Sequence, residues 1–138
     1  MYCRVCLAKT NYREIPYALL TPDWYSEIQL IYKQYSTAKQ LNSVLPIFLE
    51  ELEAANTEII GYFDSNNSLD AFSLIYLYPS QNSCIADQFA WNYKDPDKKL
   101  GYRSIRSECA RYKRLGFQYL YLGEPAPYKQ ELQGFEFV

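Results

Sequence analysis

The sequence of 138 residues contains no histidine. Without an imidazole, the chain has no Ser-His or Cys-His nucleophile pair and no zinc site that depends on histidine ligands. Any proton transfer by a side chain must use Asp, Glu, Tyr, Cys or Lys. Long apolar runs are also absent, since none approaches the ~18 residues of a membrane helix and no signal peptide is recognisable. We therefore expect a soluble, cytoplasmic protein that has no membrane partner.

The chain length is sufficient for one domain with one core, and we expect residues 1–138 to form a single domain. A nucleotide-binding domain joined to a separate substrate domain does not fit in this length. Hydrophobic residues make up 49% of the chain, and its 15 tyrosines are amphipathic. This composition is typical of a globular protein rather than a disordered or membrane-embedded one.

The four cysteines show half of a metal or redox pattern. Cys3 and Cys6 form a CxxC pair, whereas Cys84 and Cys109 stand alone, so the second pair of a zinc site is missing. The segment around Cys3 also has the composition of a strand, in which cysteine packs as a small hydrophobic residue. We expect reduced thiols and no metal, and a metal or redox role for Cys3 and Cys6 stays an alternative.

Charge is distributed unevenly along the chain. The net charge of −2 predicts no general attraction to nucleic acid. Residues 94–114, however, hold eight of the 14 basic residues and only three acids. This concentration favours a local anionic ligand such as a phosphate group. The alternative is a solvated helix face.

Hydrophobic periodicity and turn residues predict an α+β fold in the order β-α-α-β-β-β-α-β-α-β. Short turns around 64–68 and 80–83 make the three middle strands antiparallel neighbours. The following strand-helix-strand series, closed by Gly116, predicts a parallel crossover within one mixed sheet. The expected strands are 2–9, 57–63, 69–78, 84–93, 117–122 and 135–138; the expected helices begin at 21–23, follow 42–43, and span 102–115 and 128–132.

Two helices carry apolar stripes. The first is expected to place Trp24, Ile28 and Ile31 on one face, and the third Ile105, Cys109 and Tyr112. The second helix is expected to carry Leu45, Phe48, Leu49 and Leu52, with Pro46 in its first turn.

The segment 95–101 is the strongest candidate for a binding site. It joins a strand to a helix, and backbone N–H groups at a helix start form an anion site. Gly101 permits close approach of a ligand, and Lys98 and Lys99 add positive charge. This combination suits a pyrophosphate, although an ordinary turn has the same features.

The order of elements resembles that of the GNAT superfamily of acyltransferases. In that family the corresponding loop, with the pattern Gln/Arg-x-x-Gly-x-Gly/Ala, holds the pyrophosphate of coenzyme A, and the fourth and fifth strands splay to admit the acyl arm. Here the matching six residues are 96–101, of which only the final Gly101 fits. The resemblance implies acetyl-CoA or another acyl-CoA as cofactor. The implied cofactor-binding residues are Lys98, Lys99, Leu100, Gly101, Tyr102 and Arg103.

A second likeness is more local. The segments 93–105 and 115–123, followed by Tyr128-Lys129, resemble the C-terminal half of arginyl and leucyl aminoacyl-tRNA–protein transferases. Those enzymes carry Tyr-Asp-Pro-Asp, Leu-Gly-Thr-Tyr, Tyr-Tyr-Leu-Gly and Tyr-Lys, whereas Lys94 is inserted in the first motif here. The likeness covers roughly residues 57–138 and lacks their N-terminal domain. It implies an acyl-transfer ancestry, with tRNA as a less favoured partner.

The GNAT resemblance also implies catalytic roles. A tyrosine after the fifth strand often serves as the general acid, which points to Tyr128. Asp87 on the fourth strand and Glu124 after the fifth are the candidate bases. Each of the three has an ordinary alternative, namely packing for Tyr128 and solvent exposure for the two acids.

The sequence therefore predicts a GNAT-fold N-acyltransferase that moves an acyl group from acyl-CoA, or from aminoacyl-tRNA, to an amine. The acceptor is an amine-bearing small molecule or protein, and a homodimer is a further expectation. The alternative is a non-catalytic GNAT-like binding or assembly module of the kind found in small phage-type proteins.

Overall fold

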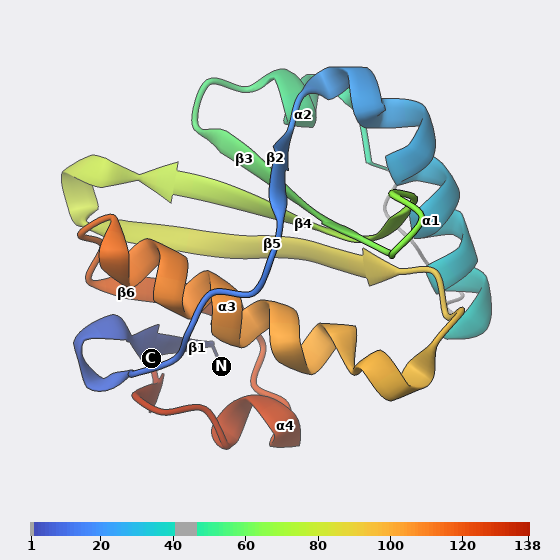
Figure 1. Ribbon diagram of the computed structural model, residues 1–138. Helices are drawn as coiled ribbons and strands as arrows, with labels where there is room; N and C mark the ends of the chain where they lie inside the picture. Colours follow the sequence, from blue (N-terminus) through green and yellow to red (C-terminus); the bar gives the residue numbers. More distant parts are fainter. Residues whose placement is uncertain (1, 41–46) are drawn as a thin grey trace.

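The computed structural model describes residues 2–40 and 47–138. In this part of the chain, seven strands form one sheet in the order β2-β3-β4-β5-β6-β1-β7 (Figure 1). The predicted α+β mixed sheet is confirmed. The strands are β1 (Cys3–Cys6), β2 (Ala18–Leu20), β3 (Thr57–Phe63), β4 (Leu69–Tyr78), β5 (Ser83–Trp91), β6 (Tyr119–Gly123) and β7 (Phe135–Phe137), and the helices are α1 (Tyr25–Ala38), α2 (Leu49–Glu53), α3 (Leu100–Arg114) and α4 (Pro127–Gln130).

Strand directions follow the predicted turns. β3, β4 and β5 pair antiparallel through short connections, and the first turn is closed by Asp64, whose Oδ1 accepts from the amides of Asn66 and Ser68. β5 and β6 are parallel, with α3 crossing between them. Gly116 follows α3 with a φ of 93°, which confirms the predicted left-handed cap.

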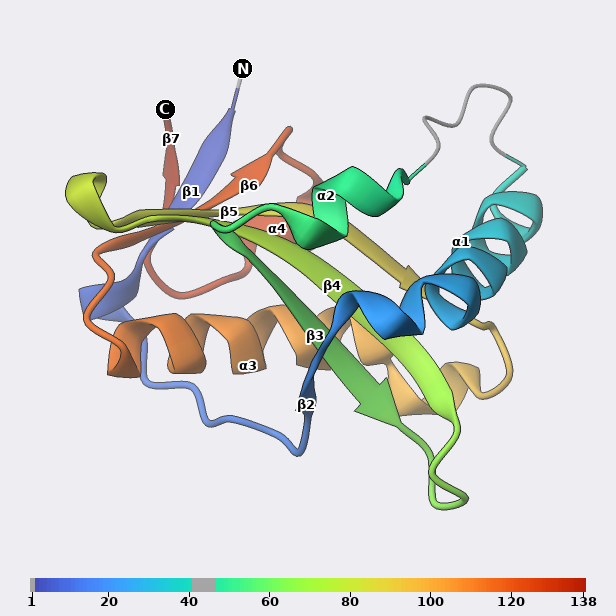
Figure 2. The same ribbon diagram turned by 90° about the horizontal axis from the view of Figure 1, so that it is seen from above.

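Helices cover both faces of the sheet. α3 packs on one face, while α1 and α2 pack on the other (Figure 2). Alternation along each strand produces two cores, because successive side chains point to opposite faces. Ile60 thus packs with Tyr112 of α3, whereas its neighbour Ile59 packs with Ile28 of α1.

The predicted element order is wrong at one place, because it omits β2. This strand of three residues follows β1 directly and pairs only with β3, at the edge of the sheet. Ala18 and Leu19 are exposed, so the segment shows no alternation of apolar and polar residues that would predict a strand. β1 is also shorter than predicted, because Leu7–Lys9 form a 3₁₀ turn.

Two helix boundaries differ from the expectation. Phe48 precedes α2 rather than lying within it, and its side chain is 55% exposed. The predicted start of this helix at 42–43, together with Leu45 and Pro46, lies outside the described residues. Gly101 belongs to the first turn of α3 and not to the preceding loop, because the helix begins at Leu100.

Two further findings concern membrane and metal contacts. Across residues 2–40 and 47–138, none of the helices combines the length and the apolarity needed to cross a bilayer. In the same ranges, the acidic and thiol side chains form no group of three or more that could hold a metal ion. Cys3 is buried, Cys6 is partly buried, and both are free thiols.

Candidate active site

The parallel ladder between β5 and β6 is short. It joins Ser83–Ile85 to Tyr119–Tyr121, after which β5 continues to Trp91 paired with β4 but no longer with β6. The register of β4 and β5 shifts nearby: Ile75 pairs with Ala86 but Leu74 with Gln88, which leaves Asp87 as an extra residue. A bulge of this kind bends a strand away from its neighbour. The two strands therefore separate toward their C-terminal ends, as the GNAT resemblance implies.

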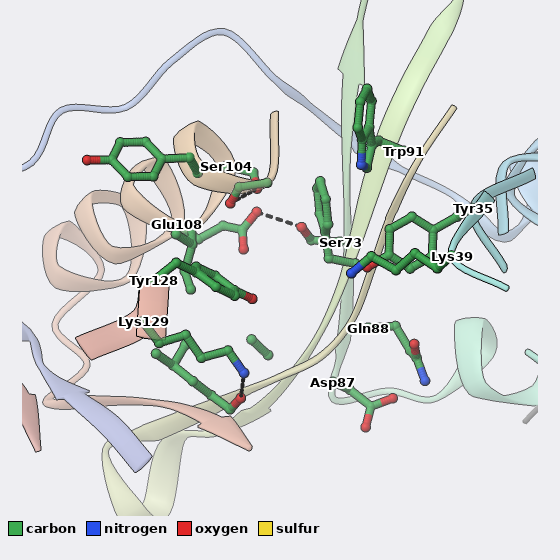
Figure 3. A pocket seen from close by; sticks show the side chains of 16 residues that line it. Tyr35, Lys39, Ser73, Asp87, Gln88, Trp91, Ser104, Glu108, Tyr128 and Lys129 are labelled. Carbon is green, nitrogen blue, oxygen red and sulfur yellow. Dashed lines mark hydrogen bonds between the residues drawn. The ribbon is translucent and has the colours of Figure 1, made fainter. Parts of the chain in front are cut away.

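A pocket of about 420 Å³ opens where the strands separate (Figure 3). Aromatic rings form much of its wall, and a small number of polar groups point into it, which is the usual character of a ligand site. It draws on α1, β4, β5, α3, β6 and α4. The lining residues are Tyr35, Lys39, Ser73, Ala86, Asp87, Gln88, Phe89, Trp91, Gly101, Tyr102, Ser104, Ile105, Glu108, Leu122, Tyr128 and Lys129.

Glu108 is the main polar feature of this pocket. Its side chain comes from α3, and the residue is only 4% exposed. Tyr62 and Ser73 both donate hydrogen bonds to its Oε2, the latter at 2.6 Å. Figure 3 shows the other carboxyl oxygen directed into the pocket. Burial raises the pKa of Glu108 from 4.5 to about 7, although the two hydroxyl donors act in the opposite direction.

A second partly buried carboxylate, Glu58, provides a contrast. Arg111 bonds both of its oxygens, at 2.8 and 3.3 Å, and Tyr112 donates to it at 2.8 Å. Glu108 has no comparable cation, since no Lys or Arg in the described ranges forms an ion pair with it. A carboxylate that is buried without a cation and faces a pocket is a typical functional group.

The sequence analysis missed Glu108, although a signal existed. It lies three residues after Ile105 and four before Tyr112, both on the apolar stripe of α3. A carboxylate within an apolar stripe is unusual, and it predicts either a buried partner or a functional site.

The three predicted catalytic residues occupy different positions. Tyr128 lines the pocket from α4, is 50% exposed and points its hydroxyl inward (Figure 3). Burial raises the pKa of Tyr128. Asp87 lines the same pocket on its exposed side, and burial and then the charge of Glu51 raise its pKa. Glu124 is not among the lining residues, and only its main-chain carbonyl is bonded, by Lys129.

Only some of the six predicted cofactor-binding residues line the pocket. Gly101 and Tyr102 line the pocket, whereas Lys98, Lys99, Leu100 and Arg103 do not. Lys98 instead forms an ion pair with the buried Asp70 at 2.7 Å.

Backbone amides in this segment are mostly occupied. Three amides of the segment, those of Asp95, Leu100 and Gly101, have no acceptor among the described residues, and the last two lie at the start of α3. Unpaired amides at a helix start are suited to an anion, and the two at Leu100 and Gly101 are too few for a pyrophosphate cradle. The amides that donate within the segment are those of Asp97, Lys98, Lys99, Tyr102 and Arg103.

Comparisons with known proteins bear on the fold. No protein-family model and no curated protein sequence matches the chain. L-PGS from Bacillus licheniformis superimposes with a TM-score of 0.71 at 13% identity, over 91% of this chain and 45% of that chain. Ribosomal-protein-alanine N-acetyltransferase from Brucella melitensis gives 0.65 at 15% identity, over 90% and 96% of the two chains. A protein assigned to the GNAT acetyltransferases of Novosphingobium aromaticivorans gives 0.68 at 17% identity, over 99% and 59%.

These similarities show that the chain has a GNAT-like fold. At such low identity they extend to the fold alone. The chain spans 45% of the L-PGS chain, and also 45% of a similar structure described as the C-terminal domain of a lysylphosphatidylglycerol synthetase from Agrobacterium fabrum.

Proposed function

We propose that the chain is an N-acyltransferase that acts in the pocket between β5 and β6. The observation that carries this proposal is the position of Glu108, a buried carboxylate that faces the pocket in a GNAT-like fold. Acyl transfer to an amine requires a base, because an ammonium group has no lone pair for attack. A carboxyl group with a pKa of about 7 exchanges protons readily near neutral pH.

Glu108 is the proposed general base, and Tyr128 is the proposed general acid. The Glu108 carboxylate takes one proton from the acceptor ammonium, whose nitrogen then attacks the carbonyl carbon of the donor. The new C–N bond forms as the donor C–S bond, or C–O bond in an ester, breaks. The Tyr128 hydroxyl donates its proton to the leaving thiolate or alkoxide, and the second proton of the amine replaces it on Tyr128. Glu108 then releases its proton to water.

The donor site is proposed at the start of α3. The amides of Leu100 and Gly101 would hold a phosphate group of the donor, and the Lys99 ammonium makes no side-chain bond within the described residues. Acyl-CoA is the preferred donor because the donor arm then enters between the separated strands. Aminoacyl-tRNA, implied by the likeness in 93–129, is the second donor to test.

The test combines binding with turnover. In a thermal-unfolding titration, acetyl-CoA at 100 times its Kd would stabilise the fold by about 2.7 kcal/mol. Transfer to a panel of amines should be detectable, and Glu108→Gln should lower kcat by about 10²-fold or more. Glu124→Gln is the matched control, because Glu124 does not line the pocket. Equal turnover of the two variants would contradict the assignment of Glu108.

One observation favours the non-catalytic alternative. The segment 95–103 satisfies most of its amides internally, and Lys98 is bound to Asp70, so little of a pyrophosphate cradle remains. A binding or assembly module would keep the pocket without transferring a group. If neither donor stabilises the protein and no acyl transfer is detected, this alternative replaces the enzyme.

A further inference from the structure

Two neighbouring strands direct hydroxyl groups at one carboxyl oxygen. Tyr62 of β3 pairs with Ala71 of β4, and Ser73 pairs with Ile60, so Tyr62 and Ser73 are diagonal neighbours on one face of the sheet. That face is the one covered by α3, which carries Glu108. Both hydroxyls donate to Oε2 of Glu108.

This arrangement distinguishes the two oxygens of the carboxyl group. Oε2 accepts two hydrogen bonds, while Oε1 accepts none from the described residues. The bonds also restrict rotation of the carboxyl group, because both donors are rooted in buried strands. Oε1 is consequently the oxygen left open to the pocket (Figure 3).

We propose that Tyr62 and Ser73 are positioning residues: they fix Oε2 of Glu108, aim Oε1 at the pocket as the proton-accepting atom, and set the pH at which the site becomes active. This inference rests on the proposed function of Glu108 as a base. The hydroxyls act through Glu108 and need not touch the substrate.

The direction of the pH effect follows from the chemistry of the donors. A hydroxyl that donates to a carboxylate stabilises the charged form and lowers its pKa, against the effect of burial. Hydrogen bonds to charged groups are strong enough that loss of one donor should raise the pKa by about one unit. The pH of half-maximal activity should rise equally.

Other ionisable groups surround Glu108 and are unchanged by these substitutions. Buried tyrosine and thiols keep their protons at neutral pH, because burial raises their pKa values. These buried groups are Cys84 of β5 and Cys109 and Tyr112 of α3. The other ionisable groups line the pocket: Tyr35 of α1, Lys39 directly after α1, Asp87 of β5, Tyr102 of α3, and Tyr128 and Lys129 of α4.

The chain offers matched controls for both hydroxyls. Tyr112→Phe removes a buried tyrosine hydroxyl that donates to Glu58 instead of Glu108. Ser104→Ala removes a pocket hydroxyl that donates to the Gly101 carbonyl. Tyr62→Phe and Ser73→Ala remove the proposed positioning groups, each without adding bulk.

The experiment measures protonation of Glu108 directly and activity separately. A pH-difference infrared titration shows the band of a protonated buried carboxyl group, and its loss in Glu108→Gln assigns that band. Ser73→Ala and Tyr62→Phe should each move the titration midpoint up by about one pH unit, whereas Ser104→Ala and Tyr112→Phe should leave it in place. An unchanged midpoint in Ser73→Ala, the smaller substitution, overturns the inference even if Tyr62→Phe does not fold.

Activity then separates this inference from the proposed function. If the acidic limb of the kcat profile moves with the infrared midpoint, both stand. If the midpoint moves but no acyl transfer occurs at any pH, the positioning role of the hydroxyls stands and the enzymatic proposal fails.

Discussion

Glu108→Gln should stabilise the protein at alkaline pH. Burial raises the pKa of Glu108 from 4.5 to about 7, so ionising the folded protein is unfavourable. A group whose pKa is raised on folding contributes its full stability below its unfolded pKa and loses that contribution as pH rises through the folded pKa. The loss therefore falls between pH 4.5 and about 7. With about 1.4 kcal/mol per pKa unit, it amounts to about 3 kcal/mol.

Glutamine imitates the protonated side chain and does not titrate. Its amide oxygen can accept the hydrogen bonds of Tyr62 and Ser73, while its NH₂ group faces the pocket. Wild type and variant should therefore be of similar stability at pH 5, and the variant should be more stable by up to about 3 kcal/mol at pH 8.

The assay is urea unfolding at a series of pH values. The difference between the two proteins cancels the titration of other groups, including Glu14, whose pKa is lowered to about 2 by hydrogen bonds from Arg114 and then Tyr17. Glu124→Gln serves as the control and should parallel wild type throughout. A difference that stays constant from pH 5 to pH 8, or that favours wild type at pH 8, would refute the reasoning.

Five further substitutions have defined outcomes. Tyr128→Phe should lower kcat by about 10²-fold with little change in Tm, because its hydroxyl is bonded to no described residue; a normal kcat removes it as general acid. Lys98→Ala should lower Tm more than Lys99→Ala, because only Lys98 pairs with a buried carboxylate; equal Tm values would contradict this ion pair. Gly101→Ala should stabilise α3 by about 0.5–1 kcal/mol, since the new Cβ meets only one ring carbon, at 3.5 Å. The same substitution should weaken binding of acetyl-CoA in calorimetry. Gly134→Ala should instead destabilise the fold, because the φ of Gly134 is 70° and a Cβ would clash with a main-chain carbonyl.

Much of the fold could be predicted because its signals are local. The turn residues at 64–68 and the positive φ at Gly116 depend on a few adjacent residues. The parallel crossover followed from the strand-helix-Gly-strand series. β2 could not be predicted in this way, because three edge residues have neither length nor alternation, and they are held by pairing with β3 and by packing of Leu20 on the core.

The site was less predictable because its contacts join distant parts of the chain. The Lys98–Asp70 ion pair spans 28 positions, and the charge pattern alone suggested that Lys98 was available to a phosphate. Likewise, the Tyr62–Glu108 bond spans 46 positions. Tyr128 and Asp87 were assigned to the cleft by resemblance, and both line it.

A comparison of Glu58 in β3 with Glu108 in α3 indicates why Glu108 requires a chemical explanation. The fold neutralises Glu58 with a bidentate arginine, which shows that α3 can supply a cation where a charge is structural. One helical turn before Arg111, Glu108 accepts hydrogen bonds from only two hydroxyl groups of the described residues, and its pKa stays above the usual value of a glutamate. A glutamine, which keeps an acceptor for both hydroxyls and carries no charge, would make this part of the core more stable at neutral pH. The carboxyl group instead faces a pocket, and under the proposed function the free energy that destabilises its charge would favour proton uptake from an ammonium group bound there.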